Sequence, residues 1–268
     1  MASFDGAALD YDDDFTFSRI GQQQREQVWT YLETLLETSG RLKILELNCG
    51  TGYDAAFLAR GGHDVVATDV SEQMLIKTKK RIQSEHLSDK VSVYRYDLTR
   101  PIGEIGDTED PTWEKESYDL IFSNFGGLNC LSQEELGNMA DDLIELLKKE
   151  GSVVMVVMPR YCLMDLLYNG LRLKVNKVYK RLFSRSIQVD VDEVEVTTFY
   201  HSLSRYSKSF IGCSLIDTRV ISFLPSYLER WIHRIQLLLY LDRMMFSILK
   251  KQRAFAPLCD HALIHIKK

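Results

Sequence analysis

The feature that most constrains the fold is an alternation of short apolar runs with helical segments between residues 43 and 158. The runs have the length of strands, and they are Lys43–Leu47, Asp64–Thr68, Val91–Tyr94, Tyr118–Ser123 and Ser152–Met158. All but the third are nearly continuous in apolar residues, which is typical of parallel strands buried on both faces. Strand and helix repeated in this way predict a doubly wound α/β fold.

Helix-start signals stand between the strands. Residues 71–82 read as one helix, which begins at a serine followed by an acid. Ser132 begins another, and Glu135 three residues later gives the pattern of a capping box. We expect this second helix to continue through Leu147 and to end near Gly151.

The alternation stops after residue 158. Residues 160–198 carry mainly helical periodicity, with an extended stretch at Val194–Thr198, and we expect a helical insertion that caps the substrate. Leu215–Phe223 reads as a further strand, a helix is expected from Pro225 through Leu239, and His261–Ile266 alternates enough to be an edge or antiparallel strand.

These elements predict one domain over residues 1–268. The expected fold is a Rossmann-like, mostly parallel seven-stranded sheet with an antiparallel C-terminal strand and the helical lid insertion. Residues 1–40 are expected to form N-terminal lid helices.

Composition narrows the class of protein and its location. The chain has 268 residues and a net charge of −5, so no overall basic surface points to nucleic acid. The five cysteines form no CxxC pair, which argues against a disulfide framework or a zinc site, and no other metal-ligand cluster is evident. No secretory signal is visible, and the longest apolar run, Leu237–Leu241, is far shorter than the roughly 20 residues of a membrane span. These features predict a cytoplasmic protein.

A bend rich in small residues follows the first strand, in the stretch LELNCGTG at residues 45–52. Ligands of open α/β sheets bind beyond the carboxyl ends of the strands, where this bend lies. Gly50 and Gly52 allow the backbone to approach a ligand closely, and Asn48 tolerates a left-handed conformation. The bend predicts a nucleotide-like ligand, although a tight turn without a ligand is the alternative.

Carboxylates follow the next two strands. Asp69 is placed to accept both hydroxyls of a ribose, with helix capping next to Ser71 as the alternative. Asp97 is placed to accept from an adenine amino group while Leu98 covers the ring, with an Asx-turn as the alternative. Three such features at successive strand ends favour a shared nucleotide-like ligand.

The bend departs from the NAD fingerprint GxGxxG. Residues 48–54 read Asn-Cys-Gly-Thr-Gly-Tyr-Asp, so the first glycine is missing and Asp54 stands at the last position. Glu46 and Asp54 flank the bend, which disfavours a pyrophosphate and suits a ligand with positive groups. S-adenosylmethionine carries a sulfonium and an ammonium.

At these residues the chain resembles the class I S-adenosylmethionine-dependent methyltransferases of the small-molecule type. Glu46–Gly52 looks like their first motif, acid-x-Gly-x-Gly-x-Gly, with Asn48 at the first glycine. Asp69 matches the ribose-binding acid, Asp97 the adenine-side acid, and Tyr118–Leu131 the fourth strand with the loop beside the transferred methyl. The resemblance covers about residues 4–158 and returns more loosely near residues 199–202 and at the C-terminus. The cofactor-binding residues that it implies are Tyr11, Thr16, Arg25, Glu46, Asn48, Gly50, Gly52, Asp69, Val70, Met74, Asp97, Leu98, Asn124, Phe125 and Asn129.

In similar enzymes an aromatic and acidic segment before the first strand closes over the cofactor. Tyr11, Phe15 and Thr16 are the candidates for that lid, and Arg25 on the following helix is placed to reach the methionine carboxylate. A solvated helix charge is the alternative for Arg25.

Methyl transfer from a sulfonium is a one-step displacement in which the protein positions the acceptor and excludes water. We expect a metal-independent reaction. A carboxylate or thiolate acceptor needs no strong base, whereas a hydroxyl, amine or carbon acid can need one. His201 with Tyr200 is the predicted catalytic pair, because a similar stretch borders the pocket in small-molecule relatives; a surface histidine at a helix start is the alternative.

Apolar residues early in the insertion suit a lipophilic acceptor. The basic run 172–185 is placed to bind an acidic acceptor, to contact an anionic membrane surface weakly, or to form the solvated face of a lid helix. Residues 231–241 are expected in the core or in a homodimer face. The sequence thus predicts methyl transfer to a small, lipophilic metabolite at O, N or C. The alternatives are a non-catalytic S-adenosylmethionine-binding protein and an NAD-dependent oxidoreductase.

Overall fold

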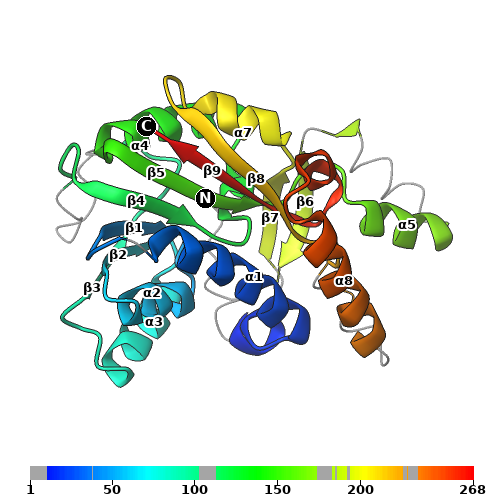
Figure 1. Cartoon of the computed structure of the whole chain (residues 1–268), viewed down its shortest axis with the longest axis horizontal. Coiled ribbons are helices and arrows are strands. Elements are labelled where there is room, and N and C mark those ends of the chain that lie inside the picture. Colours follow the sequence, from blue (N-terminus) through cyan, green and yellow to red (C-terminus); the bar gives the residue numbers. More distant parts are fainter. Residues whose placement is uncertain are drawn as a thin grey trace.

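A seven-stranded sheet in the order β3-β2-β1-β4-β5-β9-β8 organises the computed structural model (Figure 1). The structure describes residues 11–37, 39–102, 113–173, 183–184, 186–191, 194–225, 228 and 235–268. The strands of this sheet are β1 (Lys43–Leu47), β2 (Asp64–Asp69), β3 (Val91–Arg95), β4 (Tyr118–Ser123), β5 (Leu147–Val157), β8 (Ser214–Ser222) and β9 (His261–Lys267). Strands β1 to β5 are parallel, and β9 runs antiparallel to both β5 and β8. The predicted fold class is confirmed.

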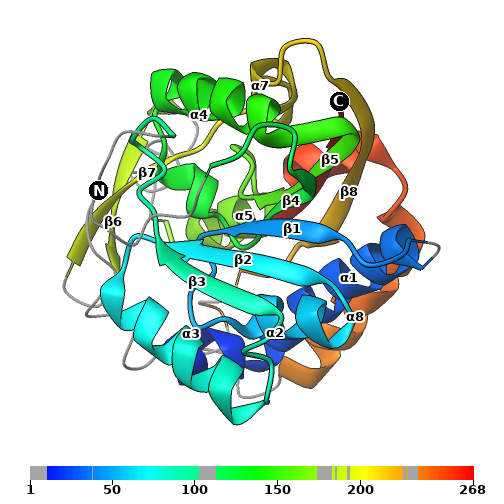
Figure 2. The same ribbon diagram turned by 90° about the vertical axis from the view of Figure 1, so that its left-hand side faces the viewer.

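Helices cover both faces of the sheet (Figure 2). The helices α1 (Arg19–Leu36), α2 (Tyr53–Arg60) and α3 (Glu72–Ser84) lie on one face, and α4 (Gln133–Leu146) and α7 (Leu203–Ser209) lie on the other. The two cores divide the residues of β1, because side chains alternate along a strand: Ile44 packs toward the first set of helices and Leu45 toward the second. The chain order reverses between β2–β1 and β4, which places the carboxyl ends of β1 and β4 at the topological switch point.

The capping signals are confirmed, but α4 ends earlier than expected. Ser132 and Glu135 form the reciprocal capping box, and Ser71 caps α3. Leu147 is extended and pairs with Tyr118 in the sheet, so the chain passes directly from helix to strand and β5 begins there.

The insertion is only partly helical. Helix α5 (Leu163–Leu171) matches the expectation, but β6 (Ser186–Val191) and β7 (Val194–Phe199) form an antiparallel hairpin, so the predicted helix is wrong at residues 186–191. The sequence SIQVDV alternates polar and β-branched residues with a period of two, which favours a strand. Residues 174–182 and 185 of the predicted basic helix lie outside the described residues.

The C-terminal region completes the sheet. Strand β9 is antiparallel as predicted but lies between β5 and β8, so β8 forms the edge. Helix α8 (Ile235–Leu249) begins ten residues after Pro225, and Trp231 lies outside the described residues. Short turns η1 (Asp12–Thr16), η2 (Gly127–Cys130) and η4 (Arg253–Leu258) complete the described elements.

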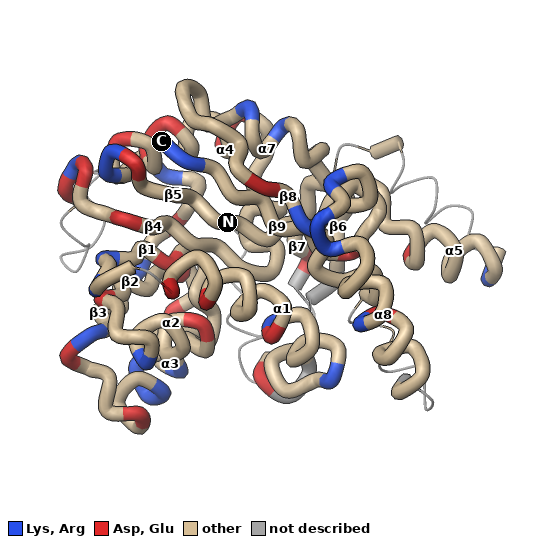
Figure 3. The backbone as a smooth tube through the Cα atoms, viewed as in Figure 1, with Lys and Arg blue, Asp and Glu red and all other residues tan. Residues whose placement is uncertain are grey.

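Charges are mixed along the helices and loops, where Lys and Arg alternate with Asp and Glu (Figure 3). Among the described helices, none combines the length and the apolar composition needed to cross a bilayer. Figure 1 shows the hairpin β6–β7 beside the end of the sheet at which β4 and β5 finish.

Candidate active site

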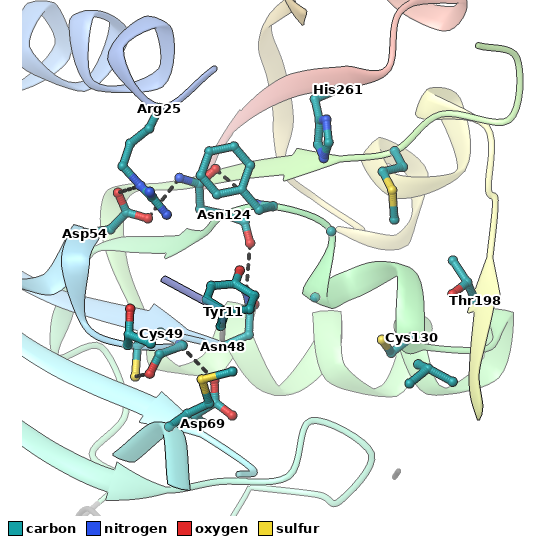
Figure 4. Close-up of a pocket in the computed structure, with 18 of the residues that line it drawn as sticks. Tyr11, Arg25, Asn48, Cys49, Asp54, Asp69, Asn124, Cys130, Thr198 and His261 are labelled. Carbon is teal, nitrogen blue, oxygen red and sulfur yellow. Dashed lines mark hydrogen bonds and ion pairs between the residues drawn. The ribbon is translucent and has the colours of Figure 1, made fainter. Parts of the chain in front are cut away.

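A cavity of about 370 Å³ lies at the carboxyl ends of β1, β2 and β4 (Figure 4). Its walls come from the N-terminal segment, the loops after these strands, the hairpin and the start of β9. One side, which we call the cofactor side, is lined by Tyr11, Arg25, Asn48, Cys49, Gly50, Thr51, Tyr53, Asp54, Asp69, Met74, Asn124 and Phe125. The other, the acceptor side, is lined by Gly126, Gly127, Cys130, Met158, Val189, Val196, Thr198, Tyr200, Pro225, Asp260 and His261.

Asn48 joins the loop after β1 to the loop after β4. It has a left-handed backbone with φ of +47°, and its Nδ2 donates to the Asn124 carbonyl at 2.8 Å while its Oδ1 accepts from Ser123 Oγ at 2.6 Å. A Cβ added to Gly127 would lie 2.3 Å from Asn48 Cγ, so the glycine makes room for this amide. The asparagine that departs from the glycine pattern is therefore a bridge between two walls of the cavity.

Asp69 lies at the end of β2, on the floor of the cofactor side. Its Oδ2 accepts from the Gly50 N–H and its Oδ1 from the Ser71 N–H, both at 2.9 Å. Ser71 caps α3 by accepting from the Met74 N–H, so Asp69 is not needed as the cap. A carboxylate has about four lone-pair sites, which leaves room for further donors such as sugar hydroxyls.

Arg25 is a buried cation at the cofactor side, only 5% exposed, which excludes the solvated alternative. Its Nε lies 3.2 Å from Asp54 Oδ1, and its guanidinium lies over the rings of Phe125 and Tyr53 at 4.9 and 5.0 Å. Asp54 also accepts from Trp29 Nε1 at 2.6 Å and from Asn124 Nδ2 at 3.0 Å. Arg25 Nη1 has no hydrogen-bond partner among the described residues, so a donor remains for a ligand carboxylate.

Glu46 and Thr16 are buried behind the cavity and do not line it. Glu46 is 2% exposed, and burial together with the charges of Asp54 and Asp69 raises the pKa of its carboxyl well above its usual value. Thr16 is 1% exposed. The structure thus brings neither side chain to the cavity surface.

The predicted adenine region lies beside the cavity. Val70 and Leu98 line a smaller adjoining hollow that shares Asp69 and Cys130 with it. The Asp97 carboxylate does not line either space, and its Oδ1 accepts from the N–H and the hydroxyl of Thr99 at 2.9 and 2.8 Å, which is the Asx-turn alternative.

Two further predicted residues support the walls from within. Gly52 is the left-handed residue before α2, where an added Cβ would lie 2.6 Å from the Thr78 methyl. Asn129 is fully buried; its Nδ2 donates to the carbonyls of Met158 and Phe199, and its Oδ1 accepts from the Met158 N–H at 2.9 Å. Asn129 therefore connects the end of β5 to the end of β7.

The predicted catalytic pair is divided by the structure. Tyr200 lines the cavity, but His201 does not; its Nε2 lies 2.9 Å from the Leu131 carbonyl and its ring stacks on Phe199. Burial lowers the pKa of His201. A base role for His201 remains a prediction without a contact to the cavity.

Residues 44–151, which include the three strand ends and the cavity floor, match a family model described as a methyltransferase domain. Residues 44–151 therefore carry a methyltransferase domain. The chain is 30% identical over 153 residues to a demethylmenaquinone methyltransferase of Clavibacter sepedonicus, in an alignment that covers 57% of this chain and 55% of the relative. The chain thus spans about half the length of that relative.

Solved structures show the same fold. A methyltransferase from Mesorhizobium loti described as S-adenosylmethionine-dependent superposes with a TM-score of 0.57 at 16% identity, covering 90% of this chain and 98% of that one. The geranyl diphosphate C-methyltransferase of Streptomyces coelicolor, in complex with Mg2+, geranyl diphosphate and S-adenosyl-L-homocysteine, gives 0.55 at 12% identity, covering 89% and 78%.

The acceptor side of the cavity is built mostly by residues that sequence reasoning missed. Val189 and Val196 are cross-strand partners in the hairpin, and both line the cavity with Met158. Burial raises the pKa of Cys130 to about 11, so its thiol is a packed neutral group. The alternation of the hairpin was a usable signal for the valines, but no local pattern indicated His261, which was read only as the first residue of a strand.

The phenol of Tyr11 contributes to the polarity of the cavity. Burial raises the pKa of Tyr11 to about 12, so its phenol stays neutral at the cofactor side. Among the described residues, no group of three or more His, Cys, Asp and Glu side chains is placed to hold a metal ion.

Proposed function

We propose that this chain is an S-adenosylmethionine-dependent methyltransferase that acts on a small, mostly apolar metabolite at an oxygen, nitrogen or carbon atom. The observation that carries the proposal is one continuous cavity with unlike sides. Its cofactor side holds Asp69 and a buried Arg25 with an unused donor, and its acceptor side is mainly apolar. Bound S-adenosylmethionine would supply a methyl group activated by a sulfonium.

The residues fit this cofactor. Asp69 would accept from the ribose hydroxyls, and Arg25 Nη1 would donate to the methionine carboxylate, for which this buried nitrogen has no other partner in the described chain. Val70 and Leu98 would border the adenine in the adjoining hollow. Several other predicted cofactor residues line the same side of the cavity, and Asn129 would hold the walls from behind through its hydrogen bonds.

The chain's own part in the reaction would be to orient the acceptor and to exclude water. Phe125 contacts the acceptor side, because its ring centroid lies 5.7 Å from that of His261 in an edge-to-face arrangement. Because the sulfonium itself provides the electrophile, the proposed displacement needs no metal ion.

Apolar lining supports the lipophilic acceptor. Met158, Val189 and Val196 form much of the wall opposite the cofactor side. One relative is named for demethylmenaquinone and one fold neighbour holds geranyl diphosphate, and these two names agree with an organic small-molecule acceptor.

Three finer inferences stay proposals from the sequence. The cytoplasmic location rests on the cysteine pattern of the sequence. The weak membrane contact through residues 172–185 falls mostly outside the described residues. The homodimer face at residues 231–241 has only its last part described, in α8, where Leu237 and Tyr240 are exposed.

A release assay tests the proposal. The protein is incubated with S-adenosylmethionine and a panel of phenols, quinols, amines and fatty acids, and formation of S-adenosylhomocysteine is measured by mass spectrometry. Acceptor-dependent formation is the expected result. Binding of S-adenosylhomocysteine without turnover on any acceptor would favour the non-catalytic alternative, and binding of NAD alone would overturn the cofactor assignment.

A further inference from the structure

A histidine and an aspartate at the start of β9 reach the acceptor side of the cavity. Asp260 and His261 both line it, and each is 5% exposed. The imidazole of His261 points into the cavity between the loop after β4 and the hairpin (Figure 4). A buried, polar pair in a mostly apolar wall needs a reason, because each such group costs free energy unless it is partnered.

The two side chains lie in contact. His261 Nδ1 is 2.8 Å from Asp260 Oδ2, which is the distance of an ion pair, although the two groups are not aligned as a hydrogen bond. The aspartate is held on its other sides: Oδ1 lies 3.6 Å from Cys162 Sγ, and its N–H donates to the Ser222 carbonyl at 2.7 Å. The carboxylate therefore has a fixed position beside the imidazole.

The surroundings of His201 and His261 impose opposite proton positions. The Leu131 carbonyl can only accept, so a neutral His201 must carry its proton on Nε2. The negative charge of the Asp260 carboxylate, 2.8 Å from Nδ1 of His261, favours a proton on Nδ1, which would leave Nε2 as the nitrogen with a lone pair. Among the described residues, His261 Nε2 has no hydrogen-bond partner.

We propose that His261 is the general base of the acceptor side and that Asp260 is a positioning residue that fixes its tautomer. The inference rests on the proposed function and narrows its substrate class to acceptors with an O–H, N–H or acidic C–H group. The acceptor's proton passes to Nε2, the acceptor's electron pair forms the bond to the methyl carbon, and the carbon–sulfur bond breaks with its pair left on sulfur. Asp260 stays ionised and offsets the charge of the imidazolium, which later releases its proton to solvent.

The tautomers can be read without any acceptor. Side-chain nitrogen NMR of histidine-labelled protein at about pH 8.5, where an ordinary imidazole is neutral, separates the two ring nitrogens. The expected result is a proton on Nδ1 of His261 and on Nε2 of His201. In Asp260→Asn, whose amide can accept from or donate to Nδ1, His261 becomes a mixture of tautomers, while His201 serves as the unchanged internal control. A proton on Nε2 of His261 in the wild type, or a tautomer that Asp260→Asn leaves unaltered, would overturn the inference.

A pair of acceptor probes tests the base role. With 2-naphthol, His261→Gln should lower the transfer rate about 100-fold or more, whereas with 2-naphthalenethiol, already ionised at this pH, the rate should fall only a few-fold. Equal losses on both probes would contradict the base role. Calorimetry with S-adenosylhomocysteine distinguishes failure of the proposed function from failure of this inference. No binding to the wild type contradicts the proposed function. Normal binding, together with a His261 tautomer that Asp260→Asn leaves unaltered, contradicts this inference alone.

Discussion

The two sides of the cavity differ in how the chain assembles them. The cofactor side comes mainly from successive strand ends between residues 48 and 125, and its charges are held by two sets of hydrogen bonds, one around Asp54 and one around Asp69. The acceptor side joins segments that are far apart in sequence, from residue 126 to residue 261, around a largely apolar wall. Local strand-turn-helix units thus build the cofactor side, whereas packing between segments distant in sequence builds the acceptor side.

The largest effect is expected where the two sides are joined. Asn129→Ala removes the fully buried amide that binds the backbone of Met158 and Phe199, and it leaves those groups without partners. We expect the free energy of unfolding to fall by about 3 kcal/mol, measured by urea denaturation. The exposed Asn138→Ala on α4 is the control and should change stability by less than about 0.5 kcal/mol. Equal stabilities of the two variants would show that Asn129 does not connect the sides.

A ligand pair tests the charge of the cofactor side. Arg25→Met removes the donor proposed for the methionine carboxylate, and we expect affinity for S-adenosylhomocysteine to fall about 30-fold, or about 2 kcal/mol. 5′-Methylthioadenosine lacks that carboxylate, so its affinity should stay within about 2-fold. Similar losses for both ligands, measured by calorimetry, would mean that Arg25 only supports the wall.

A pH series tests the neutral acid behind the cofactor side. The pKa of Glu46 is raised in the folded state, so the folded protein binds more protons than the unfolded chain above about pH 4.5. Stability contributed by this group is therefore lost as pH rises toward the folded pKa, with a slope of up to about 1.4 kcal/mol per pH unit.

Glu46→Gln should remove that slope, so its stability relative to the wild type should grow between about pH 5 and pH 7 in urea denaturation. Glu33→Gln, at an exposed side chain on α1, serves as the matched control. Parallel stability curves of Glu46→Gln and the wild type would contradict a raised pKa.

The sequence predicted the cofactor side of the cavity better than the acceptor side. The sheet, the capping box and the positions of Asn48, Asp69 and Arg25 depend on patterns within a few turns of chain, and all are where the residues indicated. Glu46 and Asp97 were placed at the correct strand ends, but a local pattern does not tell which way a side chain faces, and both lie off the cavity surface.

The acceptor side was less predictable for a physical reason. The run of basic and apolar residues after residue 171 favoured a continuous helix. In the structure, however, Ile187 pairs with Thr198 and Val189 pairs with Val196 across the hairpin. His261 enters the cavity only because β9 inserts between β5 and β8. The residues that pair between β5 and β9 are more than 100 positions apart in the sequence. His201, next to the tyrosine that does line the cavity, turns toward Leu131 instead.

The central claim is that the strand-end acids and the buried arginine bind S-adenosylmethionine, and calorimetric titration with S-adenosylhomocysteine tests it most directly. The wild type, Asp69→Ala and Asp64→Ala are compared, because Asp64 stands at the opposite end of the same strand and pairs with Arg41. We predict micromolar binding to the wild type, a loss of about 100-fold in Asp69→Ala and a change of less than about 2-fold in Asp64→Ala. No binding to folded wild type, or equal affinities for all three proteins, would contradict the account.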